Sequence, residues 1–530
     1  MRIIKSFMEN EDVSKLIVRL VLSTALFISL VCALSIAIHG DLLFHTDIAR
    51  DHLLIEDMLM KQRPALIGPR AGGIPGVFHG PLWLYINIPF FLLGNGNPVA
   101  VGRGWFVMWV GSLLLLWYVA KRVLNNTNGA LAVTTFFALL TFTRITNYLN
   151  PAGAMLVVAA WFYGVVMYYR ENKARFLALT YFIIGIIIQF QMALGVPLFL
   201  LTSLGILWII FQRKSWRHLV SIFATMPFLA TFIIFDIRHD FLQLKSVMNY
   251  LIGDVSFGKS TLTFGPLLME RFYLMRIRLE EMLSSGVLST DFVVAIVSVC
   301  FGYLIAKTRL RHISWKKSFP DFLGIFAFFW IGYWVITLMY KGVMWGYYFE
   351  PLLPVAALSF VGLIIKTSPR YGLLFVALCC ALMTPFHWLP SILSSSNRTT
   401  SVKGEWVNMK EIYERNMFST KAPKDFGYFI FTRDRLGYSQ TYAMHYLAKL
   451  HPDFNIHPFE KRKTTYLLVE TEYSSVVNQD YWKKYQVKIN SVPKEVIKLT
   501  GSFVIERYEL TDDELKIPAN TDLSTDIFYR

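Results

Sequence analysis

Two carboxylates and a guanidinium lie close together in a segment that follows the first long apolar stretch of the chain. Residues 43–58 have apolar side chains at helical spacing, and Asp47, Arg50 and Asp51 share the polar face. A spacing of three or four residues brings helical side chains within reach of one another. Two nearby carboxylates raise the proton affinity of one of them, so one could act as a general base while Arg50 holds an anion. A salt bridge on the surface of an interfacial helix fits the same spacing.

A second polar group follows in residues 68–85, which are rich in glycine and proline and lead into an apolar segment that begins at Pro81. Irregular backbone at the membrane border usually lines a cavity. Arg70 and His79 flank this turn. They could present positive or hydrogen-bonding groups to a phosphate, or they could anchor the segment to lipid headgroups.

The composition places these residues in a membrane protein. Of 530 residues, 55% are hydrophobic and only 17% are charged, which is too apolar for a soluble protein. A helix needs roughly 20 apolar residues to cross the bilayer, and stretches near that length predict about eleven transmembrane helices. They are expected at residues 16–38, 99–120, 129–143, 151–169, 176–195, 196–211, 219–235, 287–306, 322–340, 351–365 and 371–393. The apolar segment 81–94 is short for a crossing and is expected to be interfacial or re-entrant.

Basic residues predict the orientation of these helices. Lys121, Arg122, Arg213 and Lys214 are examples of basic residues in short loops that all fall on the N-terminal side of the membrane. Such loops mark the cytoplasmic face, so we expect a multi-pass plasma-membrane protein with a cytoplasmic N-terminus and an extracytoplasmic C-terminus. The net charge of +16 is explained by this signal and does not call for a nucleic-acid partner.

The chain divides into a transmembrane domain, residues 1–393, and an extracytoplasmic soluble domain, residues 394–530. Residues 39–98 and 236–286 form large outer loops of the first domain, and residues 268–282 predict an amphipathic helix, either on the bilayer surface or as a lid. The tail has short apolar or alternating runs at residues 427–432, 465–470 and 502–508 and a helical pattern near residues 436–450, which predict a small α/β domain. It could recognise an acceptor or cap the membrane domain. The four cysteines lie in predicted spans, so no disulfide is expected.

Two features of the sequence bear on nucleotide or metal chemistry. Residues 253–260 match the phosphate-binding loop of nucleotide hydrolases, but that loop needs a preceding buried strand and a following helix, and this segment lies in an outer loop. The sequence has no Asp-x-Asp pair of the kind that holds a divalent ion in many nucleotide-sugar enzymes. We therefore expect neither a nucleotide site nor a metal or other cofactor.

Six short motifs follow one another in a distinctive order along the chain. They are Asp-x-x-Arg at 47–50, Gly-Pro at 68–69, His-Gly-Pro at 79–81, Asn-Pro at 150–151, Gln-Phe-Gln at 189–191 and Tyr-Tyr-x-x-Pro at 347–351. In these motifs, over roughly residues 16–390, the sequence resembles the polytopic type C (GT-C) glycosyltransferases. The likeness is to the bacterial relatives of the protein O-mannosyltransferases and of the lipid A aminoarabinose transferases.

The resemblance implies a GT-C-like fold and a hexosyl- or pentosyltransferase. The enzyme would move a sugar, with inversion, from a polyprenyl-phosphate donor to an acceptor at the outer face, and the acceptor is a glycolipid, a polysaccharide or a protein. The resemblance makes Asp47 the general base and places Arg50, Arg70 and His79 at the donor phosphate. Other possible substrate-binding residues are Asp51, Asn150, Gln191, Tyr347 and Tyr348. Some relatives have a lysine in place of His79, an acidic residue in place of Asn150 and a histidine in place of Gln191.

A transporter or lipid flippase is the main alternative, because intramembrane polar groups and broken helices also mark substrate pathways. Against it, the two halves show no convincing repeat, and the predicted spans contain few charges, chiefly Arg19, Arg103 and Asp291. A third interpretation is a non-catalytic scaffold whose outer domain binds a partner. It predicts that Asp47 and Arg50 are dispensable.

Overall fold

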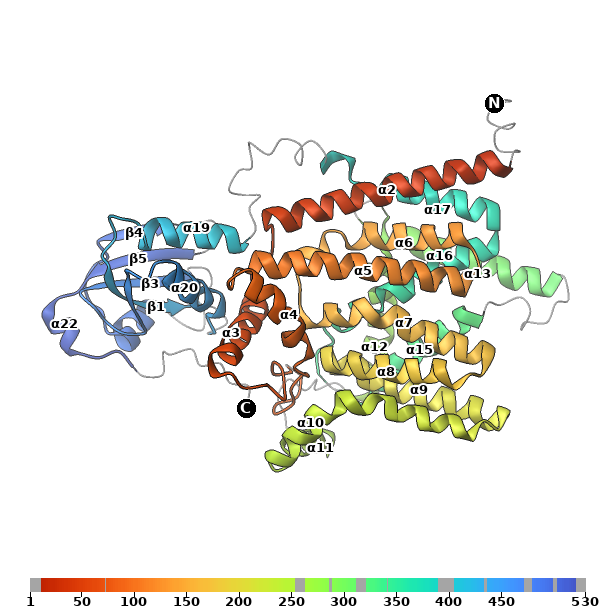
Figure 1. Ribbon diagram of the computed structural model, residues 1–530, viewed down its shortest axis with the longest axis horizontal. Helices are drawn as coiled ribbons and strands as arrows, with labels where there is room; N and C mark the ends of the chain where they lie inside the picture. Colours follow the sequence, from red (N-terminus) through yellow and green to blue (C-terminus); the bar gives the residue numbers. More distant parts are fainter. Residues whose placement is uncertain are drawn as a thin grey trace.

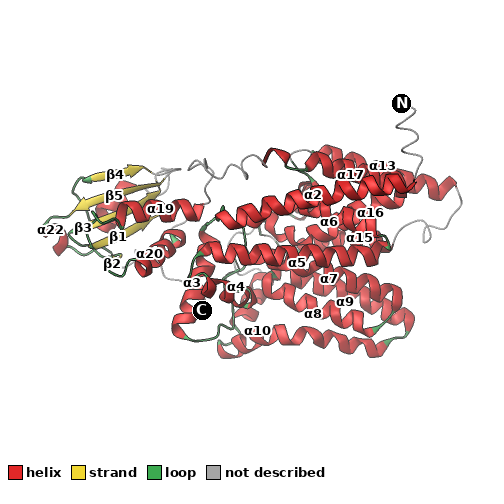
Figure 2. Ribbon diagram, turned by 45° about the horizontal axis from the view of Figure 1, so that its top comes forward, coloured by secondary structure: helices red, strands yellow, loops and turns green. Residues whose placement is uncertain are grey.

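The protein is a bundle of helices with a small sheet at one end. The computed structural model describes residues 11–71, 73–252, 263–285, 288–310, 321–340, 342–388, 405–432, 436–470, 479–498 and 503–520. Long helices lie side by side, and two shorter ones, α3 (Thr46–Lys61) and α4 (Leu82–Leu93), lie between the bundle and the sheet (Figure 1). Every strand belongs to the small domain at that end (Figure 2).

Six helical segments of the described chain are long and apolar enough to cross a membrane. They are Asp12–His39, Pro98–Leu124, Asn150–Glu171, Met192–Arg213, Trp216–Arg238 and Glu350–Thr367. Six shorter apolar helices accompany them: Leu82–Leu93, Thr127–Thr141, Ala174–Phe190, Asp291–Cys300, Asp321–Thr337 and Pro369–Met383. The chain is thus a multi-pass membrane protein, as its composition predicts. The number of spans and their orientation remain predictions.

The helices begin and end at conventional signals. In α5 (Pro98–Leu124) the Asn97 side chain accepts a hydrogen bond from the Val99 N–H, proline occupies the first position, and Lys121 and Arg122 lie in the last turn. These features satisfy free N–H groups at the start and complement the helix dipole at the end. The following helix, α6 (Thr127–Thr141), is capped in the same way by Asn126. The short turn between them fixes α5 and α6 side by side.

The remaining membrane-domain helices are α2 (Glu11–His39), α7 (Asn150–Glu171), α8 (Ala174–Phe190), α9 (Met192–Arg213), α10 (Met226–Arg238), α11 (Leu242–Ile252), α12 (Phe264–Leu283), α13 (Thr290–Leu310), α15 (Asp321–Thr337), α16 (Leu353–Thr367) and α17 (Pro369–Met383). The amphipathic segment 268–282 is helical, as its spacing predicts, and lies within α12. One face of α12 packs against α13, α15 and α16, while several apolar side chains of the other face are exposed.

The small domain has a five-stranded sheet in the order β2-β1-β3-β5-β4. The central strand β3 (Thr464–Glu470) pairs in parallel with β1 (Asp425–Phe431) and antiparallel with β5 (Phe503–Glu509). The short edge strands are β2 (Asn455–Pro458) and β4 (Glu495–Lys498). With α19 (Glu405–Met417), α20 (Tyr438–Leu450) and α22 (Asp512–Lys516), this confirms the mixed α/β prediction. The predicted domain boundary at residue 393 and the 253–260 motif lie outside the described residues.

Candidate functional site

The helix α3 carries the charged residues singled out by the sequence. It begins at Thr46, because the His45 ring nitrogen Nδ1 accepts the Asp47 backbone N–H at 3.3 Å. The other ring nitrogen of His45 lies 3.1 Å from Asn147 Oδ1, in the segment before α7. The start of α3, and Asp47 in its first turn, are thereby fixed to the transmembrane bundle.

Asp47, Arg50 and Asp51 form one hydrogen-bonded cluster, which we call the Asp47 cluster. Arg50 donates from Nη1 to Asp47 Oδ1 at 2.8 Å. It donates from Nε and Nη2 to Asp51 Oδ1 at 3.1 and 3.0 Å. Asp51 is only 4% exposed, whereas the Asp47 side chain is 53% exposed. A buried carboxylate therefore holds the guanidinium from behind, while the second carboxylate faces open space.

The charges of this cluster are set by burial and by proximity. Burial raises the pKa of Asp51 to about 6, with the neighbouring Arg50 opposing the rise. Burial alone would lower the pKa of Arg50, but Asp51 and Asp47 raise it overall, so Arg50 stays charged. A guanidinium has five N–H groups, and three are used in the bonds above. Two N–H groups of Arg50 thus have no acceptor among the described residues and can bind an anion.

The Gly- and Pro-rich segment forms a narrow hairpin beside the cluster. The Gly68 N–H donates to the His79 carbonyl at 2.7 Å, and the His79 N–H donates to the Pro69 carbonyl at 2.9 Å. The partly buried His79 ring lies near enough to the cluster for its charges to act on it. Burial, reinforced by Arg50, lowers the pKa of His79 to about 4. At neutral pH, His79 is therefore a hydrogen-bonding group and not a cation.

Arg70 lies in the same hairpin, paired across it with Phe78. Its side chain is exposed. In the part of the chain that the structure describes, no hydrogen bond or ion pair joins Arg70 to Asp47 or Arg50. The structure thus brings His79 close to the cluster and leaves Arg70 at the surface of the hairpin.

Gln189 fixes this hairpin to the bundle. Its backbone carbonyl accepts the Gly80 N–H at 2.9 Å, and its side-chain Oε1 accepts the Leu82 N–H at 3.3 Å. A Cβ atom at Gly80 would collide with the Gln189 amide, so only glycine fits. The Gln189 Nε2 donates in turn to the Phe228 carbonyl at 2.5 Å. In the sequence, Gln189 stands out only as the first residue of the Gln-Phe-Gln motif at 189–191.

Asn150 and Gln191 lie where α7, α8 and α9 meet, at the same end of the bundle. Asn150 Nδ2 donates to the Phe190 carbonyl at 2.6 Å, which supports the break between α8 and α9. Gln191 is 1% exposed, and neither of its amide atoms has a hydrogen-bond partner in the part of the chain that the structure describes. No hydrogen bond among the described residues joins either side chain to the Asp47 cluster.

The loop after α15 brings two tyrosines to the site. Tyr347 is 37% exposed and Tyr348 is buried, and their hydroxyls hydrogen-bond each other. Burial raises the pKa of Tyr347, and Asp47 and Arg50 both lie close enough to influence it. Tyr348 also hydrogen-bonds Tyr340. The loop therefore places the two tyrosine side chains beside the exposed carboxylate of Asp47.

Arg271 of α12 holds this loop in place. It is 2% exposed, and its Nη2 donates to the carbonyls of Tyr340 and Gly342, each at 3.0 Å. The Tyr340 ring stacks on Tyr250 with centroids 5.8 Å apart, and its hydroxyl lies against Gly73 of the hairpin. One buried arginine thus connects three segments around the site, and nothing local in the sequence marks it.

The small domain docks directly on α3. The Phe44 N–H donates to Glu405 Oε2 at 2.7 Å, and Ser439 Oγ donates to the Phe44 carbonyl at 2.9 Å. At the other end of α3, Glu56 is 4% exposed and pairs with Lys449 and His445 of α20. Tyr438, the first residue of α20, lies close enough to Arg50 to influence its pKa. These partners are separated by more than 350 residues, so sequence spacing gives no sign of them.

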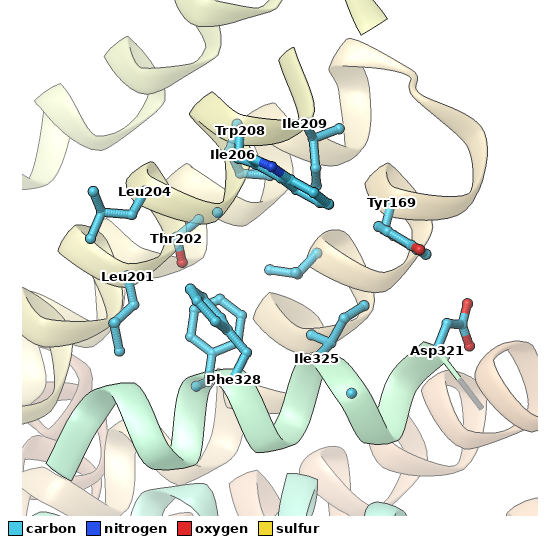
Figure 3. Close-up of a pocket in the computed structure, with 14 residues that line it drawn as sticks. Tyr169, Leu201, Thr202, Leu204, Ile206, Trp208, Ile209, Asp321, Ile325 and Phe328 are labelled. Carbon is cyan, nitrogen blue, oxygen red and sulfur yellow. The ribbon is translucent and has the colours of Figure 1, made fainter. Parts of the chain in front are cut away.

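A separate apolar groove opens between α7, α9 and α15 (Figure 3). Its volume is about 940 Å³, and Leu201, Trp208, Ile325 and Phe328 are among its lining residues. Asp321 lies at its edge and forms a bidentate ion pair with Arg170, at 2.6 and 2.7 Å. Because Arg170 is in the last turn of α7, the groove lies in the half of the bundle far from α3. At bilayer depth its lining suits a hydrocarbon chain.

In the described ranges, no group of three or more His, Cys, Asp or Glu side chains could hold a metal ion.

Comparisons with known proteins give few matches. No family model and no curated protein matches the chain. Solved structures similar to it include ArnT from Cupriavidus metallidurans bound to undecaprenyl phosphate and the same protein in the apo state. Each is 11% identical to this chain, with a TM-score of 0.42, and the alignment covers 92% of this chain and 97% of the other.

Proposed function

We propose that the protein is a membrane glycosyltransferase that moves a sugar from a polyprenyl-phosphate donor to an acceptor at the outer face of the plasma membrane. One observation carries the proposal: an exposed carboxylate, Asp47, lies beside a guanidinium that a buried carboxylate holds in place. Base and anion site are thus adjacent, as displacement of a phosphate leaving group requires.

In the proposed reaction, Asp47 takes the proton from an acceptor hydroxyl or amine. The acceptor atom attacks the anomeric carbon, and the bond from that carbon to the donor phosphate oxygen breaks. The electron pair leaves with the polyprenyl phosphate, whose developing charge faces the two free N–H groups of Arg50. A single displacement of this kind inverts the anomeric configuration.

The other site residues take supporting roles in this proposal. The neutral His79 offers a hydrogen bond to the phosphate, and the exposed Arg70 adds positive charge at the mouth of the site. Asp51 orients Arg50, and Tyr347 and Tyr348 flank the sugar. Asn150 and Gln191 act at a distance, by supporting the helix break on which the hairpin rests.

The proposed orientation is supported by the distribution of charge along the helices. Basic residues occupy the last turns of α5, α7 and α9, at the end of the bundle opposite α3. With this end in the cytoplasm, the transmembrane domain, residues 1–393, opens its site outward. The small domain, residues 394–530, is then extracytoplasmic. The acceptor, whether glycolipid, polysaccharide or protein, meets the donor between these two domains.

The test uses the full chain reconstituted in lipid, with radiolabelled polyprenyl-phosphate sugars and a membrane extract as acceptor source. We expect label to move to a new product with wild-type protein and not with Asp47→Asn. Asp57→Asn is the matched control, because Asp57 lies on the same helix but pairs with Lys61 at 2.7 Å. Full transfer by Asp47→Asn would exclude Asp47 as the base. Absence of transfer with every donor, from folded protein, would favour the transporter or flippase and call for vesicle uptake assays.

A further inference from the structure

A second cavity, which has several polar residues in its lining, lies at the end of the bundle opposite the Asp47 cluster. It has a volume of about 270 Å³ and is enclosed by the start of α2, the turn between α5 and α6, and the start of α17. Its polar lining comes from Ser14, Lys15, Asn126, Asn128 and Arg370. A water molecule occupies about 30 Å³ in the liquid, so the cavity has room for a group of several atoms.

The Arg370 side chain has unused hydrogen-bonding capacity at this cavity. Its Nε and Nη2 atoms are both buried and have no hydrogen-bond partner among the described residues. These two nitrogens form one edge of the guanidinium, the edge that binds a phosphate or carboxylate through two parallel hydrogen bonds. A buried donor without an acceptor is unfavourable. An anion in the cavity would remove that penalty once the guanidinium turns this edge toward the cavity.

The other polar groups around the cavity are also donors. Asn126 Oδ1 already accepts the Gly129 N–H at 2.9 Å, and Asn128 Oδ1 accepts from Arg19 Nε at 2.8 Å. Each amide therefore has its NH₂ group left to offer. Lys15 adds a positive charge, with Asp12 the nearest acidic residue before it on α2. The start of α17 adds the positive end of a helix dipole. The site selects for negative charge.

Its surroundings indicate a lipid. The α2 residues next to the cavity include Leu16, Ile17 and Leu20, which are 56%, 43% and 58% exposed. These apolar side chains lie on a helix that is apolar enough to cross a membrane, so they face hydrocarbon. A headgroup in the cavity would place its acyl chains along this exposed surface. Basic pockets between transmembrane helices bind anionic lipids in this way.

We propose that this cavity binds the headgroup phosphate of an anionic phospholipid. The site is independent of the sugar transfer proposed above, because it lies at the other end of the bundle and shares no residue with the Asp47 cluster. Its occupant bridges α2, α17 and the turn between α5 and α6. Binding is therefore expected to raise the thermal stability of the bundle.

The experiment measures thermal unfolding and native mass spectra of the full chain in neutral detergent. The protein is titrated with phosphatidylglycerol, phosphatidylcholine or inorganic phosphate. We expect phosphatidylglycerol to bind and to raise the unfolding midpoint, and phosphatidylcholine to do neither, because its headgroup carries a cation into a site that already holds two. Arg370→Gln should weaken phosphatidylglycerol binding by about tenfold or more, since it removes a charge-assisted pair.

Two controls make the result decisive. Arg175→Gln removes a basic residue at the same end of the bundle that is 69% exposed and lies outside the cavity, so phosphatidylglycerol binding should be unchanged. Asn128→Ala removes a neutral donor, and should weaken binding even if Arg370→Gln fails to fold. Equal lipid binding by wild type and the Arg370 and Asn128 variants would overturn the proposal. An equal effect of inorganic phosphate, lost in Arg370→Gln, would assign the site to a soluble anion and overturn the lipid assignment.

Discussion

Replacing Asp51 with asparagine tests how the buried carboxylate supports the site. Asp51 accepts from both Nε and Nη2 of Arg50, at 3.1 and 3.0 Å. Asparagine keeps the shape and removes the charge of the acceptor, so two hydrogen bonds between opposite charges become weaker bonds between the charged guanidinium and a neutral amide oxygen. The difference is roughly 1.4–2.7 kcal/mol, which corresponds to a fall in kcat/KM of about ten- to a hundredfold. Because Arg50 stays charged and still binds the donor phosphate, the loss should appear in kcat and not as a raised KM for the donor.

The same substitution should change the pH profile. Burial raises the pKa of Asp51 to about 6, so lowering the pH through 6 protonates the wild-type carboxyl and weakens its hold on Arg50. Wild-type kcat should therefore fall across this range, whereas Asp51→Asn, which has no charge to lose, should lack this acid step. Below pH 6 the two rates should converge.

The assay is the initial rate of label transfer from pH 5 to 8 by protein reconstituted in lipid. Asp57→Asn is again the control and should follow the wild-type profile. The role assigned to Asp51 would be refuted if Asp51→Asn had the same kcat as the wild type at pH 7.5. It would also be refuted if kcat of that variant still fell near pH 6 as in the wild type.

Three further predictions concern the elements around the site. Arg271→Lys should reduce transfer about tenfold and lower the unfolding temperature, because the shorter lysine side chain does not place an N–H donor where Nη2 of Arg271 binds both the Tyr340 and Gly342 carbonyls; Arg276→Lys, at an exposed position, should do neither, and equal effects of the two would contradict the role assigned to Arg271. Gly80→Ala should abolish transfer by pushing the hairpin away from Gln189, whereas Gly111→Ala, whose Cβ would meet open space, should be neutral or stabilising; an active Gly80→Ala enzyme would show that the hairpin is not needed. Burial lowers the pKa of His52 to about 4, so between pH 6.5 and 4 the unfolded chain binds a proton that the folded chain does not. The free energy of unfolding should therefore decrease as the pH is lowered across this window, by up to about 1.4 kcal/mol per pH unit. In unfolding experiments, His52→Phe should show a shallower dependence of stability on pH, and parallel dependences would count against a neutral buried His52.

The contact within the Asp47 cluster follows from sequence because it is local. Residues three and four positions apart on a helix must be neighbours once the helix forms, and the apolar spacing of residues 43–58 was enough to predict that helix. The approach of His79 and Tyr347 to the cluster is of another kind. His79 was singled out by the Gly- and Pro-rich turn that it flanks, and Tyr347 by the resemblance to a family, but no spacing rule connects residues so far apart along the chain.

The break between α8 and α9 lies before the boundary predicted from the sequence. The predicted spans 176–195 and 196–211 meet at residue 195, but the helices part at Gln191. A proline inside a helix leaves the carbonyl four residues earlier without its partner. Here the Ala193 carbonyl accepts from the Tyr333 hydroxyl at 3.0 Å, so α9 continues through Pro197. The compensating group comes from another helix and could not be read from the local sequence.

The small domain was predicted where its strands are long and buried and missed where they are short. The apolar runs at residues 427–432 and 465–470 correspond to β1 and β3, which form the centre of the sheet. The edge strands β2 and β4 have four residues each and are largely exposed. Such segments lack the alternation that identifies a strand, because only pairing with a neighbour defines them.

The contacts of the small domain favour a structural role in catalysis over a role limited to acceptor choice. Glu405 and Ser439 bind the backbone of Phe44, immediately before the helix that carries Asp47, while Glu56 ties the far end of that helix to α20. A domain that only selected acceptors would not need to hold both ends of α3. Because the position of Asp47, the proposed base, depends on these contacts, weakening them should lower kcat with every acceptor. A purely selective domain would instead change KM for one acceptor at a time.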